Sequence, residues 1–290
     1  MANLKEVRTR IASVSSTQQI TSAMKMVSAA KFRRAQNSII GMRPYAAQLS
    51  EIVDAIDFGD GLQTPYHDQR AVSRILLVVV TSNKGLCGAF NSNVIKQAES
   101  QLHTYREQYP QAKVHILAVG KRGADYFAKR GEWEMDNFSE LLDNPTFDAI
   151  ATLADDIMNR FCEKQYDLVH LVYNQFKNSL TQILSVDQFL PVAPSASEAK
   201  AKAVGDYIYE PSKEAILREM VPLTLRSHFY RVMLDSLAAE HGARMTAMQK
   251  ATDNATELLK DLKLSYNKAR QASITNEIIE IVSGSEALKG

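Results

Sequence analysis

Residues 212–288 read SKEAILREMVPLTLRSHFYRVMLDSLAAEHGARMTAMQKATDNATELLKDLKLSYNKARQASITNEIIEIVSGSEAL. Alternate steps of four and three residues along this stretch meet mostly apolar or small side chains. The series is Ile216, Met220, Leu223, Ser227, Tyr230, Leu234, Leu237, His241, Arg244, Met248, Ala251, Ala255, Leu258, Leu262, Ser265, Ala269, Ala272, Asn276 and Ile279. A seven-residue repeat of this length is typical of a coiled-coil seam and predicts one long helix.

The predicted helix is too long for a compact domain. At about 1.5 Å per residue the seam runs roughly 95 Å, whereas a globule of this chain length is about 40–50 Å across. We therefore expect the helix to leave any globule and to meet something outside it. Pro222 should bend the helix without ending it. Small and polar residues at the seam between Ser265 and Asn276 would suit a slim shaft inside a sleeve of other proteins; an ordinary frayed tail is the alternative.

Residues 1–57 predict a second long helix, with a kink or an interruption expected around Gly41–Arg43 because of Pro44. A second apolar stripe (Ile20, Ala23, Met24, Val27 and Ala30) is shifted from the seam, which predicts either a change of supercoil or a face for a third body. The two helices should pair as an antiparallel coiled coil. The seam of this helix comprises Leu4, Val7, Ile11, Val14, Gln18, Thr21, Lys25, Ser28, Phe32, Ala35, Ile39, Met42, Ala46, Leu49, Val53 and Ile56.

The middle of the chain alternates strand and helix patterns. Strands are expected at 74–81, 114–119, 133–138 and 168–173, with further strand at 180–184 and 186–190; helices are expected at 91–105, from 121 and at 147–164. This order predicts a Rossmann-like α/β domain inserted between the helices. The predicted domains are 1–57, 70–200 and 211–288, with a linker at 58–69, a loop at 191–205 and Ser212 as a helix N-cap.

Composition narrows the possible functions. The chain has 290 residues, is 45% hydrophobic and 23% charged, and carries a net charge of +1. Residues 1–43 hold eight Lys or Arg against one acid, so this face should meet an acidic partner. The sequence contains no run of 18 apolar residues, so it predicts no membrane span. Two cysteines, Cys87 and Cys162, favour a reducing compartment.

Motifs for chemistry are weak. Residues 83–91 (NKGLCGAFN) follow a strand and open a helix, where a phosphate loop would lie, but they contain neither G-x-G-x-x-G nor G-K-[ST]. We expect a structural turn with a packed, inert Cys87. The sequence contains no H-x-x-x-H or C-x-x-C pair, so no metal site is predicted. No Ser–His–Asp order that would indicate a catalytic triad stands out. The basic N-terminal stretch has one aromatic residue, Phe32, which argues against nucleic acid.

Six segments of the chain carry a resemblance to a known family: IASV (11–14), TQQITSAMKMV (17–27), RPY (43–45), GLCG (85–88) with Asn91, ATDN (251–254) and YNKARQASITNEIIEIVSG (266–284). They resemble the gamma subunit of F-type ATP synthases, and the resemblance covers the whole chain. One departure is Ser285, where the family usually has alanine. The cysteine-containing insertion of plastid members is absent, so thiol control is not expected.

The resemblance implies a function. The chain would be the central rotor shaft that couples ion flow through the membrane sector to ATP synthesis or hydrolysis in the alpha3beta3 head. It would have no catalytic site, cofactor or metal of its own, and one copy would serve each complex. Its partners would be the alpha, beta and epsilon subunits and the c-ring, with delta involved at most indirectly. It would lie peripherally on the cytoplasmic side of a bacterial plasma (inner) membrane.

The resemblance also implies contact residues. Positions matching those that touch the beta and alpha subunits are Met24, Arg270, Gln271, Thr275 and Glu277. Positions expected at the foot, near epsilon and the c-ring, are Tyr207, Tyr209 and Glu210. The acidic beta lever of the family would suit the basic face of residues 1–43.

Two other classes of function stay open at the level of sequence. One is a nucleotide-binding enzyme, which would hold its ligand at the turn of residues 85–88. The other is a coiled-coil scaffold with no moving role.

Overall fold

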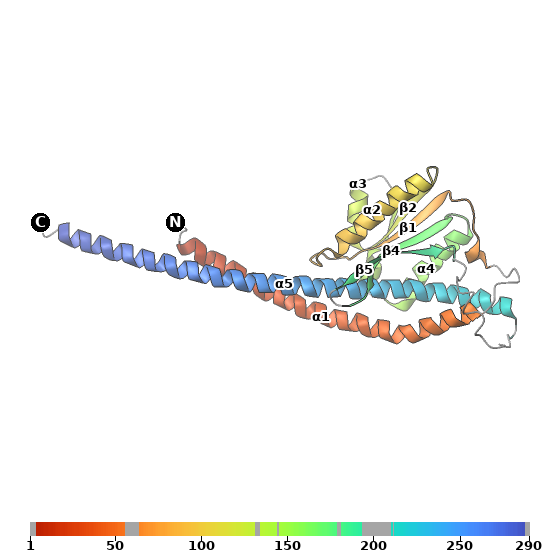
Figure 1. Cartoon of the computed structure of the whole chain (residues 1–290), viewed down its shortest axis with the longest axis horizontal. Helices are drawn as coiled ribbons and strands as arrows, with labels where there is room; N and C mark the ends of the chain where they lie inside the picture. Colours follow the sequence, from red (N-terminus) through yellow and green to blue (C-terminus); the bar gives the residue numbers. More distant parts are fainter. Residues whose placement is uncertain are drawn as a thin grey trace. The chain divides into compact units, whose positions relative to one another are not determined.

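The computed structural model describes residues 4–55, 64–130, 134–143, 145–178, 181–192, 210 and 212–287. The chain forms two compact units, and both long helices pass from one unit into the other. Unit 1 is Met1–Ser28 with Met245–Gly290, and unit 2 is Ala29–Arg244. The elements (Figure 1) are α1 (Leu4–Ala55), η1 (Pro65–His67), β1 (Arg74–Val80), α2 (Phe90–Gln108), β2 (Lys113–Val119), α3 (Lys121–Arg130), β3 (Glu134–Asn137), η2 (Ser139–Leu142), α4 (Phe147–Cys162), β4 (Leu168–Phe176), β5 (Gln182–Leu190) and α5 (Lys213–Ala287).

Unit 2 is built on a five-stranded sheet in the order β3-β2-β1-β4-β5. The pairs β1–β2, β1–β4 and β2–β3 are parallel, and β5 pairs antiparallel with β4. Strand β1 is central because its sequence, RILLVVV, is apolar on both faces; every residue after Arg74 is buried. The strand order reverses at β1, because β2 and β3 lie on one side of it and β4 and β5 lie on the other. The carboxyl ends of β1 and β4 therefore form the topological switch point of the sheet.

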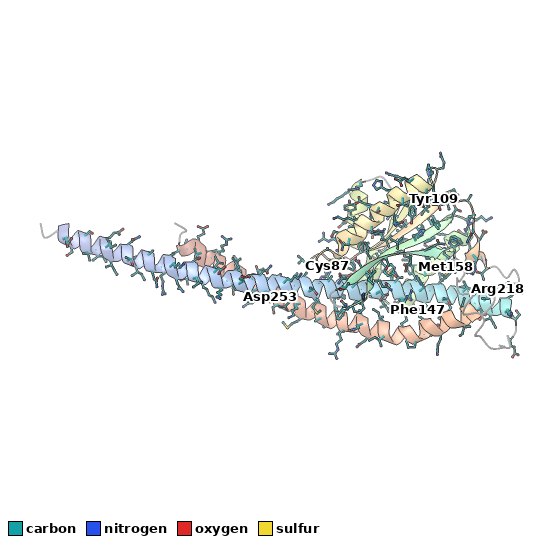
Figure 2. The ribbon with its side chains drawn as sticks, viewed as in Figure 1. Cys87, Tyr109, Phe147, Met158, Arg218 and Asp253 are labelled. Atoms are coloured by element: carbon teal, nitrogen blue, oxygen red, sulfur yellow. The ribbon has the colours of Figure 1, made fainter. Side chains whose placement is uncertain are left out.

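Helices cover both faces of the sheet. On one face, β1 residues such as Ile75 and Leu77 pack with α2 and with Phe127 of α3. On the other face, Leu76 and Val78 pack with α4 and with α5. Phe147 of α4, which is labelled in Figure 2, meets Tyr230 of α5 edge to face, with ring centroids 5.3 Å apart. The residues of α5 in this core are Leu217, Val221, Leu225, Phe229, Val232 and Met233.

The first third of α5 is thus a layer of the α/β unit as well as a coiled-coil helix. The sequence pattern predicted only the seam toward α1. It did not predict the stripe toward the sheet, because the spacing of apolar residues along a helix does not indicate which element they pack against. In unit 2 the seam toward α1 buries Ile39 against Leu234 and Ala238. Near it, Phe32 of α1 and Phe176 of β4 lie with ring centroids 5.4 Å apart.

In unit 1 the first part of α1 and the last part of α5 run antiparallel. Thr21 Oγ1 and Thr252 Oγ1 are 2.8 Å apart, and Gln18 Nε2 donates to Thr256 Oγ1 at 2.7 Å. Polar seam positions are therefore satisfied across the pair. As predicted, α5 is the longer helix, with 75 residues against 52 in α1. Both helices continue through their prolines, Pro44 and Pro222.

The seam of α5 in unit 1 differs from the predicted one at alternate positions. Leu259 is 8% exposed, whereas the predicted seam residue Leu258 is 40% exposed. Likewise Tyr266, not Ser265, is partly buried. A straight α-helix drifts by about 20° per heptad from a strict seven-residue repeat, so a seam extrapolated from Ile216 arrives one position early.

Other sequence expectations match the described residues. Ser212 caps α5, with its Oγ accepting from Ala215 N–H at 3.2 Å. The two strand patterns after residue 180 form one strand, β5, because no turn separates them. Trp133 and residues 193–205 of the predicted loop lie outside the described residues.

The seam shift gives a matched pair of variants. Leu259→Ala should lower the free energy of unfolding by about 2 kcal/mol, since it removes a side chain packed between two helices. Leu258→Ala should cost under about 1 kcal/mol because its side chain is already partly in water. Urea unfolding followed by far-UV circular dichroism compares them. Equal losses, or the larger loss at Leu258, would restore the seam predicted from the sequence.

Candidate functional site

The first turn of α3 follows β2 and lies beside the loop after β1, where the sequence placed a candidate phosphate loop. Its backbone N–H groups are already paired with the chain that follows β1. Lys121 N–H donates to Asn83 Oδ1 at 3.0 Å, and Gly123 N–H donates to Thr81 Oγ1 at 2.9 Å. Arg122 N–H donates to the Ser82 carbonyl at 3.1 Å. The helix terminus that could hold an anion is therefore capped from within.

Glycines make this capping possible. Gly120 has a φ of 115°, and a Cβ there would clash with the Thr81 carbonyl. A Cβ at Gly123 would lie 2.9 Å from Thr81 Oγ1. The two segments after β1 and β2 are thus in direct contact.

The loop after β1, residues 81–89, is fixed by polar contacts around a buried thiol. Asn91 Oδ1 accepts from Ser82 N–H at 2.9 Å, while Asn91 Nδ2 donates to Cys87 Sγ at 3.2 Å. Asn174, near the end of β4, donates from Nδ2 to the Phe90 carbonyl at 3.1 Å. Leu86 in this loop has a φ of 62°, which is strained for a branched side chain. The contacts around it must hold that conformation.

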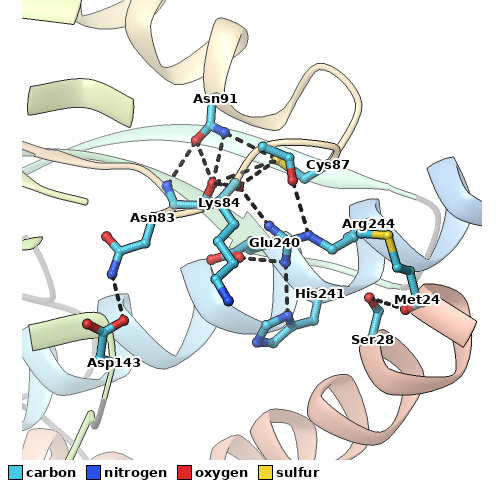
Figure 3. A network of polar contacts seen from close by, with 12 residues as sticks. Met24, Ser28, Asn83, Lys84, Cys87, Asn91, Asp143, Glu240, His241 and Arg244 are labelled. Carbon is cyan, nitrogen blue, oxygen red and sulfur yellow. Dashed lines mark hydrogen bonds and ion pairs between the residues drawn. The ribbon is translucent and has the colours of Figure 1, made fainter. Parts of the chain in front are cut away.

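Arg244 of α5 binds this loop (Figure 3). Its Nη2 donates to the Lys84 carbonyl at 2.9 Å, and its Nε donates to the Gly85 carbonyl at 3.3 Å. Its Nη1 lies 2.6 Å from Glu240 Oε1 and donates to His241 Nδ1 at 3.2 Å. Both charged residues are 7% exposed. We call Arg244, Glu240 and the loop of residues 81–89 the α5 grip.

Burial shifts the pKa values of groups in the α5 grip and of His241 beside it. It raises the pKa of Glu240, against the opposing attraction of Arg244. It lowers the pKa of His241 to about 4, with help from the positive charges of Arg244 and Lys31. It also raises the pKa of the Cys87 thiol. Cys87 is 1% exposed, so the expectation of a packed cysteine is confirmed.

The shifted stripe of α1 faces outward in unit 1. Ile20 is 60% exposed and Val27 is 58% exposed, while Met24 is half-buried beside the seam. The seam itself stays on polar Thr21 and Ser28, both buried. The stripe thus faces away from the helix pair.

The end of α5 carries the other predicted contact residues. Arg270, Gln271, Thr275 and Glu277 are all exposed. At about 100° per residue, Arg270 and Glu277 lie on one side of the helix and Gln271 and Thr275 on another, separated by roughly 100–160°. Between these two polar edges runs an exposed apolar stripe, made of Ile274 (48%), Ile278 (55%) and Ile281 (71%).

The foot residues are only partly described. Glu210 is exposed, and Tyr207 and Tyr209 lie outside the described residues. The sequence analysis missed the α5 grip. The available signal was the pair of polar residues, His241 and Arg244, at seam positions that should be apolar.

Membrane spans and metal sites also bear on function. Among the described helices, none combines the length and the apolar character needed to cross a membrane. Within the same described part of the chain, no group of three or more His, Cys, Asp or Glu side chains could hold a metal ion.

The chain is similar to known proteins over its full length. The family described as ATP synthase (ATP-synt) matches residues 3–288. An ATP synthase gamma chain of Flavobacterium johnsoniae is 52% identical over all of both chains, and that of Geobacter metallireducens is 42% identical over all of both. The central stalk/c-ring structure of Tetrahymena thermophila mitochondrial ATP synthase contains a chain with 26% identity and a TM-score of 0.61; the match covers 80% of this chain and 99% of that one.

A second solved structure extends the likeness in fold. A chain of the Euglena gracilis mitochondrial ATP synthase has a TM-score of 0.65 at 20% identity, covering 98% of this chain and 94% of that one. Two long helices around one α/β sheet thus define a class of stalk subunits. The chain belongs to the family of ATP synthase gamma chains, of bacterial type. Its role is that of the rotor shaft of an F-type ATP synthase.

The absence of a phosphate-loop motif at residues 83–91 predicts weak nucleotide binding. Calorimetric titration of the isolated chain with magnesium ATP should give no saturable heat below about 1 mM, which corresponds to less than about 4 kcal/mol of binding free energy. Tighter binding that Gly88→Ala abolishes would instead support a phosphate loop at residues 85–88.

His241 predicts a loss of stability in acid. Because its folded pKa, about 4, lies below the ordinary 6.5, the unfolded chain takes up the proton first as pH falls through that window. Stability is therefore complete above about pH 6.5 and declines toward pH 4.

His241→Gln keeps an acceptor for Arg244 and removes the titration. Between about pH 7 and pH 5 its free energy of unfolding should fall by about 1–2 kcal/mol less than that of the parent chain. Exposed His103→Gln is the control, and urea midpoints at both pH values provide the measurement. An identical pH dependence in the parent and in H241Q would contradict the prediction.

Proposed function

We propose that this rotor shaft drives its complex by contact alone, through exposed stripes on its two long helices, with no catalytic site of its own. The observation that carries the proposal is the end of α5. There every residue at positions 274–286 is exposed, and an apolar stripe is bordered by Arg270, Gln271, Thr275 and Glu277. Exposed isoleucines at this density favour a protein partner rather than water.

The partners follow from the family. We propose that Arg270, Gln271, Thr275 and Glu277 contact beta and alpha subunits, and that Met24 contacts the beta subunits beside the exposed Ile20 and Val27. Arg8, Arg10 and Arg33 on the same helix are also exposed and would suit acidic beta segments. One shaft would serve one alpha3beta3 head.

The mechanism is differential binding. A single shaft has no three-fold symmetry, so its stripes meet three equivalent subunits in three different ways. A difference of about 1.4 kcal/mol in contact free energy changes a nucleotide affinity about tenfold. Rotation would exchange these differences among the three subunits and so link turning to binding and release.

The base of the shaft would meet the membrane sector. We propose that the segment of Tyr207, Tyr209 and Glu210 contacts the epsilon subunit and the c-ring, on the cytoplasmic side of the plasma membrane. The proposed division into a helix of residues 1–57, an α/β domain of residues 70–200 and a helix of residues 211–288 assigns this foot to the approach to α5.

Replacing Arg270 and Gln271 together with alanine should weaken coupling. An exposed Arg at an interface contributes about 1–2 kcal/mol, so we expect ATP-driven ion pumping in membrane vesicles to fall at least about threefold. The chain should stay folded, because neither side chain is buried. Pumping and ATP hydrolysis are measured on the reconstituted complex.

Lys260→Ala with Asp261→Ala is the matched control, since it changes two adjacent exposed residues of the same helix. Pull-down of the complex reports assembly. Unaltered assembly and unaltered activity of the Arg270 and Gln271 variant would refute these contacts. A complex that pumps ions without any rotation of this chain would favour a static scaffold.

A further inference from the structure

We propose that the switch point of the sheet, where doubly wound folds hold a ligand, holds α5 instead, and that Arg244 is the positioning residue that carries torque across this junction. The inference rests on the rotor function. It concerns contacts inside unit 2 and adds to the partner contacts proposed above.

The placement of the α5 grip supports this reading. Asn174 ties the end of β4 to the first residue of α2, Phe90. Phe90 and Cys87 then pack against Ala239 of α5 in a small buried cluster, with Ala243 beside it. The small side chains of α5 let the loop approach the helix closely. The loop after β1 therefore closes on α5 and not on a dinucleotide.

The α5 grip extends the hold of the α/β unit along the helix. The core between the sheet and α5 ends at Met233, whereas Arg244 is the last residue of unit 2. These 11 positions correspond to roughly 16 Å of helix at 1.5 Å per residue. Fixing them shortens the length of α5 that can twist freely before torque leaves the unit.

Arg244 also resists rolling of the helix about its own axis. Apolar contacts have no preferred direction, so they permit small rolls at little cost. A roll of about 10° moves a group roughly 6 Å from the axis by about 1 Å, which is enough to break a hydrogen bond. The planar guanidinium bonds the Lys84 and Gly85 carbonyls and pairs with Glu240 at once. Lysine cannot reproduce this fork.

Cys87 reports whether the α5 grip is closed. Its thiol is buried under the loop, with Asn91 Nδ2 at 3.2 Å. The strained φ of Leu86 would relax if Arg244 released the loop, and the thiol would become accessible. Cys162 is the other cysteine and is exposed, so Cys162→Ser leaves Cys87 as the single thiol of the chain.

The test compares Arg244→Lys with Arg218→Lys in the Cys162→Ser background. Arg218 is an exposed arginine on the same helix and provides the matched control. Maleimide labelling of Cys87 is measured on the isolated chain, and ATP hydrolysis and ATP-driven ion pumping are measured on the reconstituted complex. We expect R244K to label about tenfold faster, equal to about 1.4 kcal/mol of easier opening. It should also pump at least about threefold fewer ions per ATP, with hydrolysis within about twofold and R218K unchanged.

Three results would overturn the proposal. Wild-type labelling in R244K means that Arg244 does not hold the loop. Faster labelling with unchanged pumping means that the α5 grip carries no torque. An R244K chain that unfolds while R218K folds makes Arg244 a residue of stability only. Failure of the unmodified chain to assemble or pump would instead refute the rotor function, and the labelling of the isolated chain would still decide whether Arg244 holds the loop.

Discussion

The burial of one helix in two different interfaces is the constraint on which this structure depends. Leu217, Val221 and Phe229 bury one stripe of α5 against the sheet, and Leu234 and Ala238 bury another against α1. A buried Leu or Phe contributes roughly 1.5–3 kcal/mol, so the sheet stripe alone fixes the start of α5 firmly. The helix then continues without a break into unit 1. The same helix therefore belongs to both units.

The carboxyl edge of the sheet illustrates how a common fold can take up a mechanical role. At the carboxyl edge of a doubly wound sheet, the N-terminus of a helix such as α3 can offer free N–H groups to a ligand. Here Thr81, Ser82 and Asn83 occupy those groups. The neighbouring loop turns instead to α5, where Arg244 satisfies its carbonyls. The groups that could bind a ligand bind other parts of the chain instead, and the sheet supports the shaft.

The surface of the two long helices carries exposed apolar side chains. Ile20 and Val27 on α1, and Ile278 and Ile281 on α5, stand more than half exposed within the described chain. Such stripes are unfavourable in water and favour burial against partner proteins in an assembly. They lie on the outward side of each helix, so pairing of α1 with α5 cannot cover them. This division of labour, one stripe for the pair and another for partners, suits a shaft that must be stiff and still be gripped from outside.

The amino-acid sequence was enough to predict the two long helices, their antiparallel pairing, the α/β order between them and the family. Long regular periods and apolar runs are local signals, and Ser212 and the run RILLVVV could be interpreted from neighbours in the chain. Tertiary structure alone decided which stripe of α5 meets the sheet, where Leu259 replaces Leu258 in the seam, and that Arg244 reaches Lys84 and Gly85. These depend on segments about 160 positions apart and on small accumulated rotations of a helix, which no local pattern records.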